Sequence, residues 1–529
     1  MVTILTGPSM GKPVRAIAIH WAVSGGGHAN PSQSVTDTAG RATTSITLGT
    51  VAGVDTITAS ANGTTPVVFL ATAVPGPITR LSLGANAVPA LGPVGDTALL
   101  QPTASDQFGN AVIGYGNYRW YSSDTSVATV DSYGANVPGL VHAAAPGTAT
   151  ITVTTGPLSA HTTVTVLGFT SVTVGSGQIC GTAVSGTLYC WGDNQQGDVG
   201  DGTTVARPHP TIVTAPSALT SVSAGMATCG LNASGFAYCW GPNGDGELGD
   251  GTSAYATEAF LDSPTPVVGG LSFSSISVGD AFACGVTPAH AAYCWGANDI
   301  GELGIDTLTS TCIDNAINRC SNTPLLVAGS LQFASVSAGS WEHACGLTTT
   351  GAAYCWGSDG NGELGNTSTT QMCGVPAPGY ACSHTPLPVQ GGITFISVNT
   401  GGYDTCGLGT DHAAYCWGFH ANGTTNTAVP FAVPGGLTFT VLQAGRWGYC
   451  GLVAGGTAYC WQSGYAPVAV EGAIQFVALG IGQEPCGIAA NHALYCWTND
   501  PSSGARTAPH ARQRVFRRAP SSGMIATSR

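Results

Sequence analysis

Short segments in which apolar residues alternate with serine recur along the C-terminal two-thirds of the chain, and each ends in glycine. Residues 221–225, 275–279 and 335–339 are three examples. A period of two residues indicates a half-buried β-strand. Each segment is followed by a cysteine-bounded segment with a polar centre, then by a glycine-rich turn such as 246–252, and then by a proline-bounded strand such as 265–268. The pattern therefore predicts units of four short strands and an all-β chain.

The cysteine-bounded segment, of which residues 345–357 are one copy, occurs seven times. In every copy the cysteines are ten residues apart, Gly follows the first, and Tyr and Trp flank the second. Folding at the polar centre places the two cysteines opposite each other on antiparallel strands. Opposed Cα atoms lie roughly 4.5–5.5 Å apart there, which suits a disulfide. The predicted stapled hairpins join Cys180 with Cys190, Cys229 with Cys239, Cys284 with Cys294, Cys345 with Cys355, Cys406 with Cys416, Cys450 with Cys460, and Cys486 with Cys496.

Seven copies at intervals of 36 to 61 residues indicate a repeat architecture. Four-stranded units repeated around an axis are the blades of a β-propeller, for which about four to eight blades are usual. Over about residues 169–500, the order Ser-Val-Ser-Ala-Gly, Cys-Gly-Leu, Ala-Tyr-Cys-Trp-Gly and Gly-Glu-Leu-Gly-Asp-Gly-Thr also resembles the regulator of chromosome condensation repeat. We therefore predict a seven-bladed β-propeller with a disulfide-stapled hairpin in each blade.

The resemblance implies a fold more than a function, because one fold hosts many activities. Eukaryotic members of the repeat family exchange guanine nucleotide on a small nuclear GTPase and bind chromatin, but their exchange residues match no positions here. Secreted propellers that inhibit β-lactamases through an aromatic loop face are a closer analogue. A glycan-acting enzyme at the propeller mouth is a further alternative.

Two β-sandwich modules are expected before the propeller. Short strands of alternating apolar and polar residues, separated by turn-forming residues, predict β-sandwiches. The sequences at residues 36–42, 106–110 and 120–130 resemble bacterial immunoglobulin-like repeats of the invasin type. Trp21 and Trp120 are expected in the two cores. The first module lacks a strand or two at its start, which suggests truncation. The predicted domains are residues 1–74, residues 78–167, the propeller over 169–516, and a basic disordered tail over 517–529.

Composition restricts the compartment. The 529 residues include 18 cysteines, and the four outside the hairpins pair by position as Cys312 with Cys320 and Cys373 with Cys382. So many disulfides indicate an oxidising compartment, either extracellular or at the cell surface. The export signal is expected upstream of this chain. No run of 18 apolar residues occurs, so we expect no membrane insertion.

Motifs for catalysis and for cofactors are lacking. No Ser–His–Asp motif, phosphate loop or H-E-x-x-H is present, and Glu342 beside His343 is only a weak acid–base pair. No C-x-x-C occurs, and the oxygen-rich turn at 243–247 lacks the spacing of an EF-hand loop, so a structural turn is favoured over a calcium site. We therefore expect no enzyme, no cofactor and no metal.

The candidate binding surface follows from the radial fold. The loop between the first and second strands of every blade opens on the same face, so seven loops form one ring. They vary where their flanks repeat, and they carry Trp, Tyr, Phe and Arg, which dominate interface hot spots. The candidate partner-binding residues are Met226, Asp280, Phe282, Trp341, Glu342, His343, Tyr403, Asp404, Arg446, Trp447, Tyr449 and Glu484.

Alternatives remain at this level. The aromatic side chains would equally pack over the mouth, and the carboxylates would form a solvated rim. Insertions at 305–322 and 366–384 are either a second contact surface or ordered decoration. The outer strand of the last blade comes either from 504–516, or from the strand at 163–166.

The prediction is a non-enzymatic, monomeric propeller that is displayed on immunoglobulin-like spacers and binds a protein partner. Six of the 14 Lys and Arg residues follow Asp500, but the chain as a whole carries a net charge of −13, so no nucleic-acid partner is expected.

Overall fold

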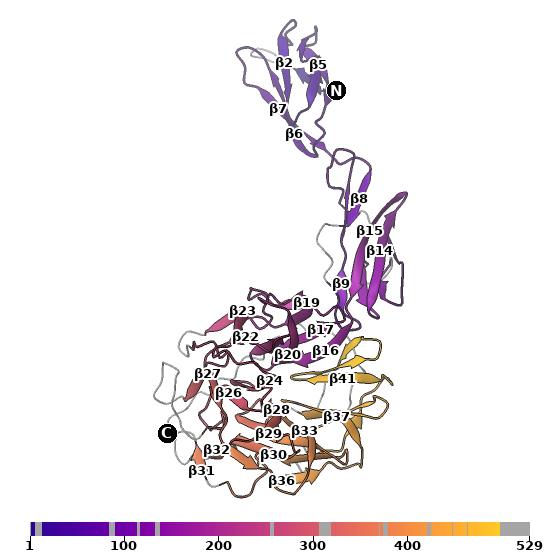
Figure 1. Cartoon of the computed structure of the whole chain (residues 1–529). Helices are drawn as coiled ribbons and strands as arrows, with labels where there is room; N and C mark the ends of the chain where they lie inside the picture. The colour runs from indigo at the N-terminus through magenta and orange to yellow at the C-terminus, as the bar shows by residue number, and fades with distance from the viewer. Residues whose placement is uncertain are drawn as a thin grey trace.

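The computed structural model describes residues 2–5, 13–83, 90–113, 117–132, 138–253, 259–305, 319–369, 371–373, 379–419, 425–446, 448–462 and 464–497. The regular elements in these residues are β-strands, arranged as two small sandwiches that lead into a propeller (Figure 1). The predicted fold class is thus confirmed. Among the described residues there is no helix with the length and apolar character that crossing a membrane requires.

The first sandwich packs one four-stranded sheet against a three-stranded one. Its sheets have the orders β4-β2-β6-β7 and β1-β5-β3. The strands are β1 (Val2–Leu5), β2 (Ala18–Val23), β3 (His28–Asn30), β4 (Gln33–Val35), β5 (Arg41–Thr47), β6 (Gly53–Ser60) and β7 (Val67–Ala73). Trp21 lies in the core with Ile19 and Ile57, as predicted.

The second sandwich has sheets with the orders β11-β14-β15, β12-β13-β9 and β10-β8. Its strands are β8 (Arg80–Leu83), β9 (Thr97–Leu99), β10 (Pro102–Ser105), β11 (Arg119–Ser122), β12 (Ala128–Val130), β13 (Leu140–Ala143), β14 (Gly147–Thr155) and β15 (Leu158–Val166). Trp120 is buried in its core, as predicted. Residues 163–166 belong to β15, which pairs with β14, so the alternative that they close the propeller is wrong.

Seven sheets follow in a ring. They contain β16 (Phe169–Val174), β17 (Gln178–Ala183), β18 (Leu188–Gly192) and β19 (Arg207–Ile212); β20 (Leu219–Ala224), β21 (Thr228–Asn232), β22 (Ala237–Pro242) and β23 (Phe260–Pro266); β24 (Ser275–Val278), β25 (Phe282–Val286), β26 (Ala292–Ala297) and β27 (Cys320–Leu326); β28 (Phe333–Ala338), β29 (His343–Thr348), β30 (Ala353–Ser358), β31 (Gln371–Cys373) and β32 (Tyr380–Pro388); β33 (Phe395–Thr400), β34 (Asp404–Gly409), β35 (Ala414–Gly418) and β36 (Thr427–Ala432); β37 (Phe439–Gly445), β38 (Gly448–Val453), β39 (Ala458–Trp461) and β40 (Val468–Ala469); and β41 (Phe476–Ile481), β42 (Pro485–Ala489) and β43 (Leu494–Cys496). The first strands of neighbouring blades contact one another around the ring, and β16 packs against β41.

The predicted disulfides staple the second and third strands of each blade. All seven hairpin pairs are bonded and stand directly opposite in register. Their Cα atoms are 4.0–4.1 Å apart, slightly closer than expected for an unbridged pair. Cys373 bonds Cys382 between β31 and β32. Cys320 is also disulfide-bonded, whereas Cys312 lies outside the described residues.

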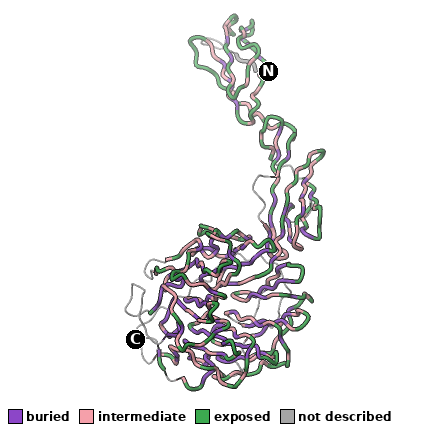
Figure 2. The backbone as a smooth tube through the Cα atoms, viewed as in Figure 1, coloured by how far each residue is buried: buried purple, intermediate pink, exposed green. Residues whose placement is uncertain are grey.

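The Gly and Trp of each hairpin join neighbouring elements. A Cβ on Gly346 would lie 2.4 Å from the ring of Phe333, so the glycine makes room for the aromatic residue that opens the blade. Trp356 is buried and its indole Nε1 donates to the carbonyl oxygen of Glu302 in the preceding blade, at 2.8 Å. Buried residues accordingly follow the strands inside the blades, and exposed ones gather at the edges (Figure 2).

The second sandwich contacts the propeller where the ring closes. The Val94 amide donates to the carbonyl oxygen of Leu494 in blade seven, at 2.8 Å. The Asp96 carboxylate lies 3.3 Å from the Nδ1 atom of His209 in blade one. Phe169, the first residue of blade one, donates its amide to the carbonyl oxygen of His492, at 2.9 Å. The sandwich therefore touches both sides of the closure. The alternative outer strand at 504–516 lies outside the described residues.

Candidate functional site

The loops between the first and second strands converge around one end of the propeller, which we call the mouth. Glycines at the ends of the first strands make this possible. A Cβ on Gly225 would lie 2.0 Å from the carbonyl oxygen of Gly279, and one on Gly279 would lie 2.3 Å from that of Gly339. The Ser176 amide donates to the carbonyl oxygen of Gly225, at 2.9 Å. The backbones of neighbouring blades are thus in direct contact at the mouth.

The repeated serines below the mouth connect the blades. The Oγ atoms of Ser223, Ser277 and Ser337 each accept a hydrogen bond from a backbone amide of the next blade, at 2.9–3.1 Å. The sequence pattern assigned these residues only to strands. In each first strand serine alternates with apolar residues. This alternation is the sequence signal that every blade presents an equivalent serine hydroxyl to its neighbour.

Three aromatic side chains from the mouth lie against one another, and we call them the aromatic stack. The ring centroids of Trp341 and Tyr403 are 4.7 Å apart, and those of Tyr403 and Phe419 are 6.1 Å apart. Tyr403 is 39% exposed and Phe419 is 41% exposed. Sequence reasoning missed Phe419 because it considered only the loops after the first strands. Phe419 follows β35, a third strand, and third strands end on the same face.

Arg446 crosses the mouth. Its guanidinium lies over the Trp341 ring, 5.0 Å from the centroid, and its Nη1 atom is 3.4 Å from the Asp280 carboxylate. These residues come from blades six, four and three, so the ion pair spans the ring rather than joining neighbours. Burial raises the pKa of Asp280 to about 6, although the charge of Arg446 opposes the shift. Arg446 therefore links blades three, four and six at the mouth.

Three of the predicted residues are interior and offer no surface to a partner. Phe282, His343 and Tyr449 are each buried. The His343 nitrogens lie 3.1 Å from the carbonyl oxygen of Trp341 and 2.9 Å from the Thr405 hydroxyl, and burial lowers the pKa of His343 to about 4. His343 is thus neutral at pH 7 and links blade four to blade five.

The remaining predicted residues occupy the loops with mixed exposure. The Tyr449 hydroxyl donates to the Asp404 carboxylate, at 2.7 Å, which ties blade six to blade five. Met226 and Glu484 are half-buried, and the Met226 carbonyl accepts a hydrogen bond from the Gln178 amide group, at 3.3 Å. Trp447 lies outside the described residues.

Carboxylates from three blades gather beside the aromatic stack. We call Asp245, Asp299, Glu342 and Glu363 the acidic arc. Partial loss of hydration, followed by the charges of Asp299 and Glu363, raises the pKa of Glu342. Burial and then the charge of Asp299 raise the pKa of Asp245. The negative charge of Asp299 thus acts on Asp245 and on Glu342, and that of Glu363 acts on Glu342.

The glycine-rich turns behind the arc use their own polar atoms. The carboxylates of Glu247 and Glu302 accept backbone amide hydrogen bonds from Asp245 and Ile300, both at 2.8 Å. Burial raises the pKa of Glu247 to about 7 and that of Glu302 to about 8.

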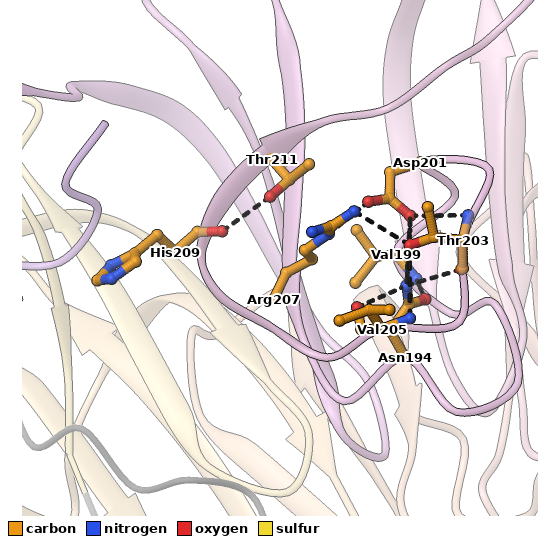
Figure 3. A network of polar contacts seen from close by, with 8 residues as sticks. All are labelled: Asn194, Val199, Asp201, Thr203, Val205, Arg207, His209 and Thr211. Atoms are coloured by element: carbon orange, nitrogen blue, oxygen red, sulfur yellow. Dashed lines mark hydrogen bonds and ion pairs between the residues drawn. The ribbon is translucent and has the colours of Figure 1, made fainter. Parts of the chain in front are cut away.

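Figure 3 shows the turn of blade one, where Asn194 closes the loop. The side-chain oxygen of Asn194 accepts a hydrogen bond from the Val199 amide, at 2.8 Å, and its side-chain NH2 group donates to the backbone carbonyl oxygens of Thr203 and Val205. Asp201 pairs with Arg207 in the same network. The turn of blade one is thus closed by hydrogen bonds among its own residues.

Comparisons with known proteins agree with the fold. Residues 96–166 match the family model for a bacterial Ig-like domain (group 2), and residues 185–230 and 333–363 each match a model for the regulator of chromosome condensation (RCC1) repeat. Both resemblances expected from the sequence are therefore confirmed: the chain carries RCC1-type propeller repeats after a bacterial immunoglobulin-like domain.

One curated relative is the ultraviolet-B receptor UVR8 of Arabidopsis thaliana, which is 29% identical over 185 residues. That match covers 34% of this chain and 40% of the receptor's length. Human WBSCR16 has a similar structure, with a TM-score of 0.52 and 14% identity over 64% of this chain and 92% of its own. Yeast RCC1 (Prp20), solved bound to Kap60, has a TM-score of 0.50 and 14% identity over 61% of this chain and 82% of its own. These two structures establish similarity of fold alone.

Proposed function

We propose that this protein is a non-enzymatic binding protein whose propeller mouth holds a protein partner. The observation that carries the proposal is the aromatic stack. Tyr403 and Phe419 are exposed and adjacent, on a ring whose other large aromatic side chains are mostly buried between blades. Exposed aromatic pairs cost free energy in water and are enriched at interface hot spots.

The chemistry of the mouth favours binding over catalysis. The candidate acid–base pair is not available for proton transfer, because His343 is buried, neutral and occupied at both ring nitrogens. The contacts of Arg446 with Trp341 and Asp280 cross the mouth, where a glycan-acting enzyme would admit its substrate. No observation favours guanine-nucleotide exchange as a second candidate.

The proposal also includes export of the protein and display of its propeller at a cell surface. The stapled blades imply an oxidising compartment, since such disulfides persist outside the reducing cytosol. The immunoglobulin-like modules would hold the propeller away from a cell surface. The Asn110 side chain donates to the carbonyl oxygen of Thr50, at 2.7 Å, and accepts a hydrogen bond from the Ala52 amide, at 2.8 Å. The Gly76 amide donates to the Asp106 carboxylate, at 2.9 Å. Such contacts favour an extended spacer over a loose tether.

Site-specific photo-crosslinking would test the proposal. A photoreactive phenylalanine analogue would replace Tyr403 in the full oxidised chain, which is then irradiated in the envelope fraction and culture medium of the source organism. The matched control carries the analogue at Phe236, which is 46% exposed in a hairpin turn at the opposite end of blade two.

The proposal expects a discrete adduct with one protein from position 403, suppressed by unlabelled wild-type chain but not by Tyr403→Ala. Equal adducts from both positions, or none that the wild type suppresses, would reject the mouth as the binding surface.

A further inference from the structure

The mouth combines the exposed aromatic rings of Tyr403 and Phe419 with the exposed carboxylate of Glu342. We infer that it recognises a basic protein segment, in which Arg or Lys residues alternate with apolar ones. This inference rests on the proposed function and adds the chemistry of the partner.

The charge balance is strongly one-sided. Between residues 169 and 497 the sequence contains 20 Asp and Glu residues and three Arg residues, without any Lys. Arg207 and Arg446 pair with Asp201 and Asp280. Arg319 donates its backbone amide to Asp299 at 2.7 Å, and its charge lowers the pKa of that carboxyl against the effect of burial. The internal cations are thus far fewer than the carboxylates, even though burial keeps Glu302 protonated at pH 7.

One exposed carboxylate lies directly beside the aromatic stack. Glu342 is exposed and follows Trp341 directly in the chain. Partial loss of hydration raises the pKa of Tyr403, the charge of Glu342 adds to that shift, and the opposing charge of Arg446 has a larger effect than that of Glu363. Two carboxylates of blade four therefore act on the same small region of surface. A cation placed there would relieve their mutual repulsion.

The protein already shows how a guanidinium fits this surface. Arg446 lies over one face of Trp341 while its end pairs with Asp280. A basic residue of a partner would repeat that arrangement on Tyr403, with its ammonium or guanidinium group toward Glu342. Cation–π contacts and buried aliphatic stems both favour Lys and Arg at such a place. Phe419 next to Tyr403 would receive an apolar neighbour.

The spread of the acidic arc and the aromatic stack over several blades favours a peptide over a small cation as the ligand. The acidic arc and the stack extend over blades two to five, so a single ammonium ion would contact only a fraction of them. A segment of several residues would contact Glu342 and the stack together. The sign of the charge disfavours nucleic acid, whose phosphates the arc would repel.

Fluorescence anisotropy with defined peptides would test the inference. The probe is a fluorescein-labelled 12-residue peptide in which Arg and Leu alternate with Ser, and its counterpart carries Glu in place of Arg. The full oxidised chain is titrated at low and at moderate salt. The variants are Glu342→Gln combined with Asp299→Asn, and Tyr403→Ala. The matched control is Glu471→Gln, since Glu471 is exposed after β40, on a connection at the opposite end of blade six.

The expected result is binding of the Arg peptide but not of the Glu peptide. Removing the two carboxylates should weaken binding roughly tenfold at low salt and flatten its salt dependence. Tyr403→Ala should weaken binding by a similar factor at both salt concentrations. Glu471→Gln should match the wild type.

Either equal binding of both peptides or wild-type affinity in the double carboxylate variant would overturn the inference. These failures are distinguishable from failure of the proposed function. A partner crosslinked at position 403 that is captured equally by the double carboxylate variant leaves the binding role intact and rejects only the basic chemistry.

Discussion

Glu302 offers the sharpest test of the physical account of the turns. It is 2% exposed, and its carboxylate accepts one backbone hydrogen bond from Ile300. Burial, reinforced weakly by Glu342 and Asp299, raises its pKa from 4.5 to about 8. The substitution Glu302→Gln keeps the shape and the carbonyl acceptor but removes the titration.

The sign and size of the change in the free energy of unfolding follow from the linkage between proton binding and folding. In the unfolded chain Glu302 ionises above its ordinary pKa of 4.5, whereas in the folded chain it stays protonated to about pH 8. The native state therefore loses stability as pH rises between these values. At about 1.4 kcal/mol per pKa unit, the full cost above pH 8 is about 5 kcal/mol, and at pH 6.5 it is about 3 kcal/mol. Relaxation of the turn would reduce both figures.

Urea unfolding followed by tryptophan fluorescence from pH 5 to pH 9 would measure the effect. Glu302→Gln should equal the wild type near pH 5 and exceed it increasingly toward pH 9. The exposed Glu471→Gln serves as the control and should run parallel to the wild type throughout. If the Glu302→Gln and wild-type curves also run parallel, Glu302 is ionised in the folded protein and the assignment of a buried neutral acid is refuted.

Three further predictions concern packing. Gly225→Ala would place a Cβ against the carbonyl oxygen of the neighbouring loop, so urea unfolding should show a loss of about 2 kcal/mol or more, whereas Gly244→Ala, which meets nothing within 4 Å, should change little. Trp295→Phe removes an indole hydrogen bond and should cost about 1 kcal/mol more than Trp461→Phe, whose indole Nε1 has no partner within the described ranges. Gly92→Val would place a Cβ 2.7 Å from the ring of Pro210 in blade one, so amide hydrogen exchange in a peptide over residues 90–98 should become faster. Unchanged exchange would contradict the described contact between the second sandwich and the propeller.

Local repetition made the blades predictable. A spacing of ten residues between cysteines, with a polar centre, has few structural solutions, and seven copies repeat the same constraint. The role of the hairpin tryptophans in packing follows from the same repetition. Trp461 and Trp497 mark where the repeat decays, because blades five and six lack the Gly-Glu-Leu-Gly sequence whose carbonyl oxygen accepts the indole hydrogen in earlier blades.

The arrangement of the side chains at the mouth depends on closure of the whole ring, so the sequence predicted it less well than it predicted the blades. No sequence pattern reveals that Arg446 and Asp280, three blades apart, meet across the opening. The sequence also does not show which loop side chains are buried: His343 and Tyr449 turn inward, and Tyr403 turns outward. Tyr449 reaches Asp404 past Gly401, where a Cβ would lie 2.7 Å from its hydroxyl, so a glycine in one blade decides the burial of an aromatic residue in the next.

The contact of the second immunoglobulin-like module with both sides of the ring closure has a mechanical consequence. A pull on the N-terminal modules against a partner held at the mouth would reach blade one through the chain at Phe169 and through Asp96 with His209, and blade seven through Val94. The load would be shared across the seam instead of peeling the first blade from the last. The joint would then resist tension along the axis on which the propeller is displayed.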